Sequence, residues 1–159
     1  FSIRDKELIF FNSHITCYNF YDIFNKNHFN NYQKIAVIRN PWDRLVSRYF
    51  YSKKIDLKFR NFTFKEFVNF DIKNNMHVLN QYRFCTKDKV SFCIDNVIKF
   101  ENLNNDFNEI SLSIFGKKNL LKHSNKTEHG KYRSYYDTEL KDKIYKNFKE
   151  DINFFDYEF

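Results

Sequence analysis

Residues 34–49, which read KIAVIRNPWDRLVSRY, combine side chains that suit the binding of a phosphate group. The guanidinium of Arg39 presents a planar fork of N–H donors that can form two parallel hydrogen bonds to a phosphate. Asn40 followed by Pro41 is typical of the start of a helix, where free backbone N–H groups and the helix dipole attract anions. These residues together predict an anion clamp at Arg39.

The hydrophobic pattern on either side of Arg39 predicts the elements that must position it. Residues 35–38 form a short apolar, β-branched run, which is typical of a buried strand. Beyond Pro41, apolar residues recur at steps of three and four, which predicts a helix: Trp42, Leu45, Val46 and Tyr49. Arg39 therefore lies where a strand ends and a helix begins, which is the edge at which open α/β sheets bind their ligands.

Each residue of this segment also has a simpler interpretation. An arginine at the end of a strand is more often a solvated surface residue than a ligand clamp. Ser47 can face solvent or bond back to a carbonyl of its own helix, and Arg44 can pair with Asp43 or another acidic neighbour. It is the combination of a strand with the pattern R-N-P-x-x-R-x-x-S-x-Y that favours a binding function.

That combination resembles the 3′-phosphate-binding motif of the sulfotransferases that use 3′-phosphoadenosine-5′-phosphosulfate (PAPS), especially Golgi-type carbohydrate sulfotransferases and their bacterial relatives. In that family, an Arg and a Ser at the positions of Arg39 and Ser47 bind the 3′-phosphate of PAPS. The resemblance implies sulfuryl transfer from PAPS to a hydroxyl of a carbohydrate, without a metal. It implies an α/β fold, a three-layer P-loop nucleotide-binding-like domain with a mainly parallel sheet, over residues 1–159 as a single domain.

His14 is the candidate catalytic base. On its own, a histidine here is more often a half-buried polar residue near a helix start. The segment N-S-H-I-T-C-Y-N-F, followed by I-A-V-I-R-N-P, looks like the corresponding stretch of heparan sulfate 2-O-sulfotransferases, in which a His at this place is regarded as the base. An imidazole titrates near neutral pH and can take the proton of a sugar hydroxyl. Those enzymes have a second His two residues earlier, where this chain has Asn12.

The resemblance implies further site residues in two other segments. The spacing H-x-x-x-Q, His77 to Gln81, is similar to a segment that borders the acceptor cleft, although a structural pair bonded to carbonyls is the alternative. The polar stretch 122–133 resembles an N-K-(S/T)-x-H-x-x-Y-R stretch that lies over the nucleotide, rather than a solvated linker. The residues implied there are Asn125, Lys126 and Arg133.

Glu101 follows a predicted strand at residues 92–100. In the family this Glu ends a strand near the ligand edge, and its expected role is to orient neighbours, for example by pairing with an arginine. A surface Glu at a helix start, favourable for the helix dipole, is the alternative.

The phosphate loop that holds the 5′-phosphosulfate in this family has no counterpart in the chain, which contains only two glycines. Because the chain begins with Phe1, we expect this first strand and its loop to lie upstream, so that the chain is the C-terminal portion of the family domain. Loss of catalysis is the alternative, and a non-catalytic module that binds an anionic nucleotide or a sulfated glycan is the second hypothesis for function.

The net charge of +7 suits an anionic nucleotide and an anionic glycan. Nucleic acid is an alternative on charge alone, but no nucleic-acid module is recognised. The three cysteines have no C-x-x-C spacing, which argues against zinc, and Cys85 and Cys93 are either bridged or buried free thiols. A membrane anchor is expected only upstream of Phe1. The location follows from the source: the cytoplasm for a bacterial or viral protein, the Golgi membrane for a eukaryotic one.

The remaining elements follow from caps and periodicity. A helix is predicted at about residues 16–26, a polar turn at 25–31 and an irregular stretch at 51–61. Thr63 and Glu66 predict a capping box for a helix at about 64–70. Further helices are predicted from Leu103 to Gly116 and, capped by Asp137, through Ile152.

Overall fold

The computed structural model describes residues 2–4, 7–9, 16–23, 26–74, 80–88, 90–119, 121 and 127–159. The chain divides into two compact units. Unit 1 comprises residues 1–36 and 81–96, and unit 2 comprises residues 37–80 and 97–159.

The described part of unit 1 contains a small antiparallel hairpin and three short helices. The elements are β1 (Ser2–Arg4), β2 (Glu7–Ile9), α1 (Cys17–Ile23), α2 (Lys26–Asn31) and α5 (Gln81–Phe84). The predicted helix at 16–26 therefore ends early, and the predicted turn at 25–31 is wrong because α2 forms there. Phe29 supplies the reason: its ring is 2% exposed and packs against Phe20 and Tyr21, with ring centres 6.0 and 5.0 Å apart. Tertiary packing of one aromatic side chain thus overrides a polar local sequence.

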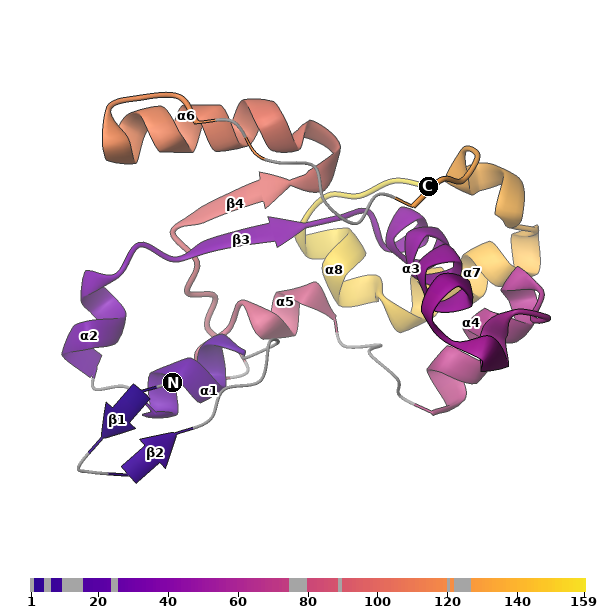
Figure 1. The fold of residues 1–159 in the computed structure, drawn as a ribbon, viewed down its shortest axis with the longest axis horizontal. Coiled ribbons are helices and arrows are strands. Elements are labelled where there is room, and N and C mark those ends of the chain that lie inside the picture. Colours follow the sequence, from indigo (N-terminus) through magenta and orange to yellow (C-terminus); the bar gives the residue numbers. More distant parts are fainter. Residues whose placement is uncertain are drawn as a thin grey trace. The chain divides into compact units, whose positions relative to one another are not determined.

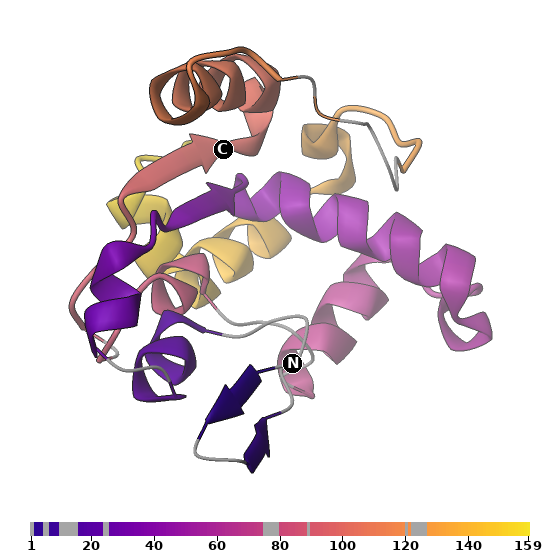
Figure 2. The same cartoon turned by 60° about the vertical axis from the view of Figure 1, so that its left-hand side comes forward.

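Strands β3 (Ile35–Ile38) and β4 (Asn96–Lys99) form a two-stranded sheet and run parallel (Figure 1). The second view shows the same two strands side by side (Figure 2). Their inward-facing residues, Ile38 and Ile98, are almost fully buried. The α/β class with a parallel sheet is confirmed. The strand predicted at 92–100 is shorter than expected, because Cys93 donates its N–H to the Cys85 carbonyl before the strand begins and Phe100 starts a 3-10 helix.

Helix α3 (Pro41–Ile55) follows β3 and continues through residues predicted to be irregular. It ends at Asp56, whose N–H donates to the Ser52 carbonyl, and the 3-10 helix η1 (Leu57–Phe59) follows. The prediction missed these turns because the outer face of the helix is basic and polar, while Ser52 and Phe59 are buried.

Local signals placed the next helices correctly. Helix α4 (Phe64–Lys73) begins with the predicted capping box of Thr63 and Glu66. The 3-10 helix η2 (Phe100–Asn102) leads into α6 (Leu103–Phe115), which ends at Gly116 with a φ of +68°, in the left-handed region that glycine favours.

The last predicted helix is two helices. After the 3-10 helix η3 (Tyr132–Tyr135), Asp137 caps α7 (Thr138–Asn147), and α8 (Lys149–Phe154) follows. The break falls at Phe148, whose backbone leaves the helical conformation while its side chain is 0% exposed.

The main hydrophobic core lies in unit 2, where α3 packs with α4, α7 and α8. Its central side chains include Val46, Phe67, Ile144 and Phe148. Among the described helices, not one has the length and apolar character needed to cross a membrane.

Candidate functional site

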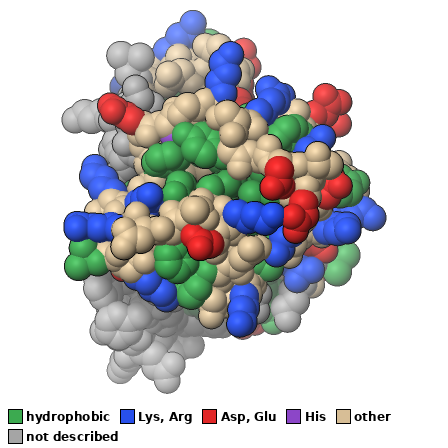
Figure 3. Space-filling model, turned by 90° about the vertical axis from the view of Figure 1, so that its right-hand side faces the viewer, with side chains coloured by type: hydrophobic (Ala, Val, Ile, Leu, Met, Phe, Trp, Pro, Cys, Tyr) green, Lys and Arg blue, Asp and Glu red, His purple; other side chains and the backbone are tan. Residues whose placement is uncertain are grey.

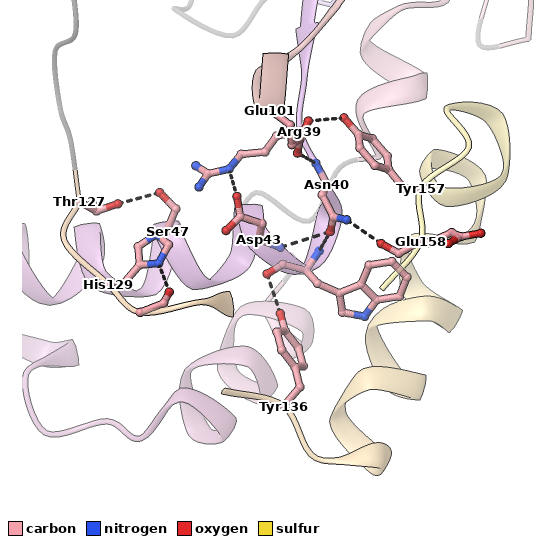
Figure 4. Close-up of polar contacts among 12 residues, drawn as sticks. Arg39, Asn40, Asp43, Ser47, Glu101, Thr127, His129, Tyr136, Tyr157 and Glu158 are labelled. Carbon is pink, nitrogen blue, oxygen red and sulfur yellow. Dashed lines mark hydrogen bonds and ion pairs between the residues drawn. The ribbon is translucent and has the colours of Figure 1, made fainter. Parts of the chain in front are cut away.

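Arg39 lies directly after β3, and two neighbours fix its guanidinium. Its Nε donates to Asp43 Oδ2 at 2.7 Å, and its guanidinium carbon lies 4.3 Å from the centre of the Phe100 ring. The side chain is 18% exposed. The terminal nitrogens point away from Asp43, toward the side on which Ser47 and Thr127 lie (Figure 4). Asp43 and Phe100 therefore orient the terminal edge of the fork toward that side.

Asn40 caps α3, as predicted, with Pro41 in the first turn. Its Oδ1 accepts the N–H groups of Trp42 and Asp43 at 3.0 and 3.4 Å, and its carbonyl accepts that of Arg44 at 2.8 Å. The expectation of free N–H groups at this helix start is therefore wrong, because Asn40 occupies them and Pro41 has none. The helix contributes its dipole here, while hydrogen bonds to an anion must come from groups other than the N–H groups of this helix start.

Ser47 lies on the same side of α3 as the end of the Arg39 side chain (Figure 4). Its Oγ is 2.9 Å from the Oγ1 of Thr127, and either hydroxyl can donate. The ring of His129 stacks on Phe50, with centres 5.6 Å apart. These two contacts hold residues 127–130 against α3. Sequence reasoning did not name Thr127, although it occupies the S/T place of the N-K-(S/T) pattern.

A cavity of about 280 Å³ opens beside the Arg39 turn. It is lined by Asn40, Asp43 and Glu101 on one side and by residues 130–133 on the other. Arg133 is exposed, and its Nη2 donates to the carbonyl of Phe159 at 2.8 Å. Lys131 and Arg133 thus bring two positive charges next to the Arg39 turn.

The two carboxylates of the cavity serve to position other groups. Asp43 is engaged by Arg39, and Glu101 accepts the Asn40 N–H at 2.7 Å and the Tyr157 hydroxyl at 3.1 Å. Burial, with Glu101 alongside, raises the pKa of Tyr157, so its hydroxyl stays a donor. Glu101 orients the turn as expected, but it does so through the Asn40 backbone.

Arg44 and Arg48 have different partners from Arg39. Arg44 lies 3.9 Å from Asp151 of α8, and Arg48 lies 3.0 Å from Asp71 of α4. Both aspartates are buried, with side chains 0% and 2% exposed. These two arginines therefore tie α3 to its neighbouring helices.

Of the predicted site residues, the structure assigns Arg39, Ser47 and Arg133 to unit 2. Gln81 begins α5 in unit 1. His14, His77, Asn125 and Lys126 lie outside the described residues. The roles given to all these residues stay predictions. In the part of the chain that is described, His, Cys, Asp and Glu side chains form no group that could hold a metal ion.

The geometry places arginine, lysine and hydroxyl side chains around a strand-to-helix junction of an α/β fold. A model of the sulfotransferase family matches residues 5–158. The chain therefore belongs to the sulfotransferase family, whose reaction is the transfer of a sulfuryl group. No curated protein and no solved structure matches it.

Proposed function

We propose that this chain binds PAPS and that the protein transfers its sulfuryl group to a hydroxyl of a carbohydrate acceptor. The observation that carries the proposal is the placement of Arg39 and Ser47. The terminal nitrogens of Arg39 and the hydroxyl of Ser47 lie on one side of the α3 start (Figure 4). The residues next to them in the turn, Asn40 and Asp43, line a cavity together with Lys131 and Arg133.

The 3′-phosphate of PAPS is the group that this arrangement suits. A guanidinium can pair with two phosphate oxygens through parallel hydrogen bonds, and Ser47 adds one hydroxyl donor. Thr127 adds a second hydroxyl next to it. A cavity of about 280 Å³ is at the small end for a ligand site, which fits a part of a nucleotide rather than the whole.

In the proposed reaction, the acceptor oxygen attacks sulfur while the bond between sulfur and the bridging phosphate oxygen breaks. His14 is the proposed base for the acceptor proton. Arg39 and Ser47 hold the nucleotide, and Asn125, Lys126 and Arg133 are proposed to contact it from the other side. Positioning supplies much of the rate in such a transfer, since the reacting groups are held in line.

The carbohydrate acceptor is proposed from the resemblance to carbohydrate sulfotransferases, with His77 and Gln81 at the acceptor cleft. The net charge of +7 suits an anionic glycan. On the face shown in Figure 3, lysine and arginine side chains are interspersed with acidic ones, so the coloured residues of this face form no broad basic surface of the kind that favours nucleic acid.

Thermal unfolding with 3′-phosphoadenosine-5′-phosphate tests the nucleotide site, because this product lacks the sulfuryl group and retains the 3′-phosphate. At about 100 times its Kd, a ligand of the folded state adds about 2.7 kcal/mol, which raises Tm by about 5–10 °C for a chain of this size. Arg39→Ala should weaken binding by about 10- to 100-fold, since it removes charge-assisted hydrogen bonds.

Arg60→Ala is the matched control, because Arg60 is an exposed arginine beyond α3, in the turn after η1. It should leave the shift in Tm unchanged. A wild-type chain whose Tm does not respond to the nucleotide, or an Arg39→Ala variant that responds as strongly as wild type, would refute the proposed site. On the wild type, 3′-AMP should raise Tm more than 5′-AMP does, because the proposed site binds the 3′-phosphate.

A further inference from the structure

The five residues after α8 form a tail that contacts the Arg39 turn. The chain reverses direction at Asp156, whose φ of +54° is in the left-handed region, and the N–H of Tyr157 donates to the Ile152 carbonyl at 2.9 Å. Asp tolerates this conformation better than most residues. The reversal directs residues 157–159 toward the start of α3, where the carbonyl of Glu158 accepts from Asn40 (Figure 4).

The tail holds the turn through two hydrogen-bonded routes. The side-chain amide of Asn40 donates to the Glu158 carbonyl at 2.8 Å. The hydroxyl of Tyr157 donates to Glu101, whose other oxygen accepts the Asn40 backbone N–H. Both routes end at Asn40, the residue next to Arg39, so the tail constrains the backbone from which the clamp extends.

Phe159 joins that turn to the opposite wall of the cavity. Its ring makes edge contacts with Trp42, Tyr132 and Tyr136, at 5.5, 5.8 and 5.6 Å between ring centres. Its carbonyl accepts from Arg133 at 2.8 Å. One residue thus contacts the first turn of α3, the helix η3 and the cation that rims the cavity.

We infer that Tyr157 and Phe159 are positioning residues for the anion site, an inference that rests on the proposed function. They fix the turn that carries Arg39 relative to Arg133, which lines the cavity. A clamp of two cations binds well only if its geometry exists before the ligand arrives, because ordering side chains on binding costs free energy. Loosening the tail therefore lowers nucleotide affinity without removing a single contact to the ligand.

Two readouts on the full chain test this inference. The first is the Kd for 3′-phosphoadenosine-5′-phosphate. The second needs no ligand: Trp42 is the only tryptophan of the chain and is buried under Phe159, so acrylamide quenching of its fluorescence reports on the tail. Phe159→Ala should raise Kd by about 10-fold or more, as small misplacements of binding groups do. It should also raise the quenching constant by about twofold, because the tail opens locally.

Three companion variants make the result specific. Phe159→Tyr keeps the ring and should bind within about threefold of wild type. Tyr157→Phe removes only the tyrosine hydroxyl that donates to Glu101, and it should weaken binding by about threefold. Phe154→Ala alters an exposed ring of α8 and should change neither readout.

Wild-type Kd and wild-type quenching in a folded Phe159→Ala variant would overturn the inference. If Phe159→Ala does not fold, Tyr157→Phe decides, and an unchanged Kd there is the contrary result. If the wild type binds no nucleotide, the proposed donor is wrong. The quenching comparison then still decides whether the tail positions the Arg39 turn.

Discussion

Arg39 and Arg48 show how burial of the partner decides the role of a charged side chain. Arg39 pairs with Asp43, a partly exposed neighbour one turn away, and its terminal nitrogens point toward the side on which Ser47 and Thr127 lie. Arg48 pairs with Asp71, which is almost fully buried on α4. Among the described residues, Asp71 Oδ2 and Arg48 Nε have no hydrogen-bond partner. An ion pair that is buried and incompletely bonded adds little stability, because desolvation offsets the attraction.

Asp71 predicts a pH dependence of stability. Burial raises the pKa of this carboxyl to about 6, against the opposing pull of Arg48 and Arg44. At pH values between the ordinary pKa of an aspartate and about 6, Asp71 holds a proton in the folded chain but not in the unfolded chain. The contribution of Asp71 to the free energy of unfolding therefore falls as pH rises, by about 1 kcal/mol between pH 5 and pH 7.

Urea unfolding of wild type and Asp71→Asn at both pH values measures this contribution. The stability difference, wild type minus variant, should be about 1 kcal/mol smaller at pH 7 than at pH 5. Asp142→Asn, which removes an exposed carboxylate of α7, controls for the loss of one negative charge. A difference that is equal at both pH values, or larger at pH 7, would contradict the raised pKa.

Helix α3 is the element on which the site is built. Its start is fixed by Asn40, whose side chain caps the helix and also reaches the tail, and its length carries Ser47 to the side of the Arg39 fork. Trp42 adds a hydrogen bond to the Lys141 carbonyl of α7, and its own carbonyl accepts from Tyr136. The Asn40 cap, the tail and helix α7 thus together fix the position of the first turn of α3.

Asn40→Ala should lower the free energy of unfolding by about 2 kcal/mol, since it removes a cap and a further buried hydrogen bond. Asn40→Ser keeps a cap oxygen and loses only the bond to the Glu158 carbonyl, so it should cost about 1 kcal/mol. Chemical denaturation at neutral pH separates the two variants. Equal losses would show that the bond to the tail carries the whole effect, and no loss in either would contradict the role of Asn40.

At the scale of the whole molecule, the site rests on the core of unit 2. Phe148 lies at the break between α7 and α8 with its ring fully buried, and the Arg44 guanidinium carbon is 5.1 Å from the ring centre. The core therefore holds α3 through both apolar packing and Arg44. Its buried members come from two separate segments, residues 42–68, which include Val46, and residues 140–152, which include Ile144.

Phe148→Ala should lower the free energy of unfolding by about 3–5 kcal/mol, because it leaves a cavity in this core. That is a large share of the roughly 5–15 kcal/mol of a typical domain, so the urea midpoint should drop sharply. Phe115→Ala removes a ring that is 64% exposed and serves as the matched control. A loss below about 1 kcal/mol in Phe148→Ala would contradict its place in the core.

Local signals were enough to predict the parts of the fold that depend on near neighbours. The capping box of Thr63, the end of a helix at Gly116 and the strand, cap and helix around Arg39 were all predicted, since each is decided within about one turn of chain. The helix at Lys26–Asn31 and the break at Phe148 were not, because both follow from the burial of an aromatic ring against residues of other elements.

The sequence by itself determined the family resemblance and the position of Arg39 at the end of a strand. Only the tertiary structure decided what surrounds it. Thr127 meets Ser47 across 80 residues, and Glu158 meets Asn40 across 118. It also decided that the helix N–H groups are already occupied, so that an anion must be bound by other groups. The physical reason is that spacing along the chain fixes local conformation, whereas the partner of a side chain depends on which distant segments share the core.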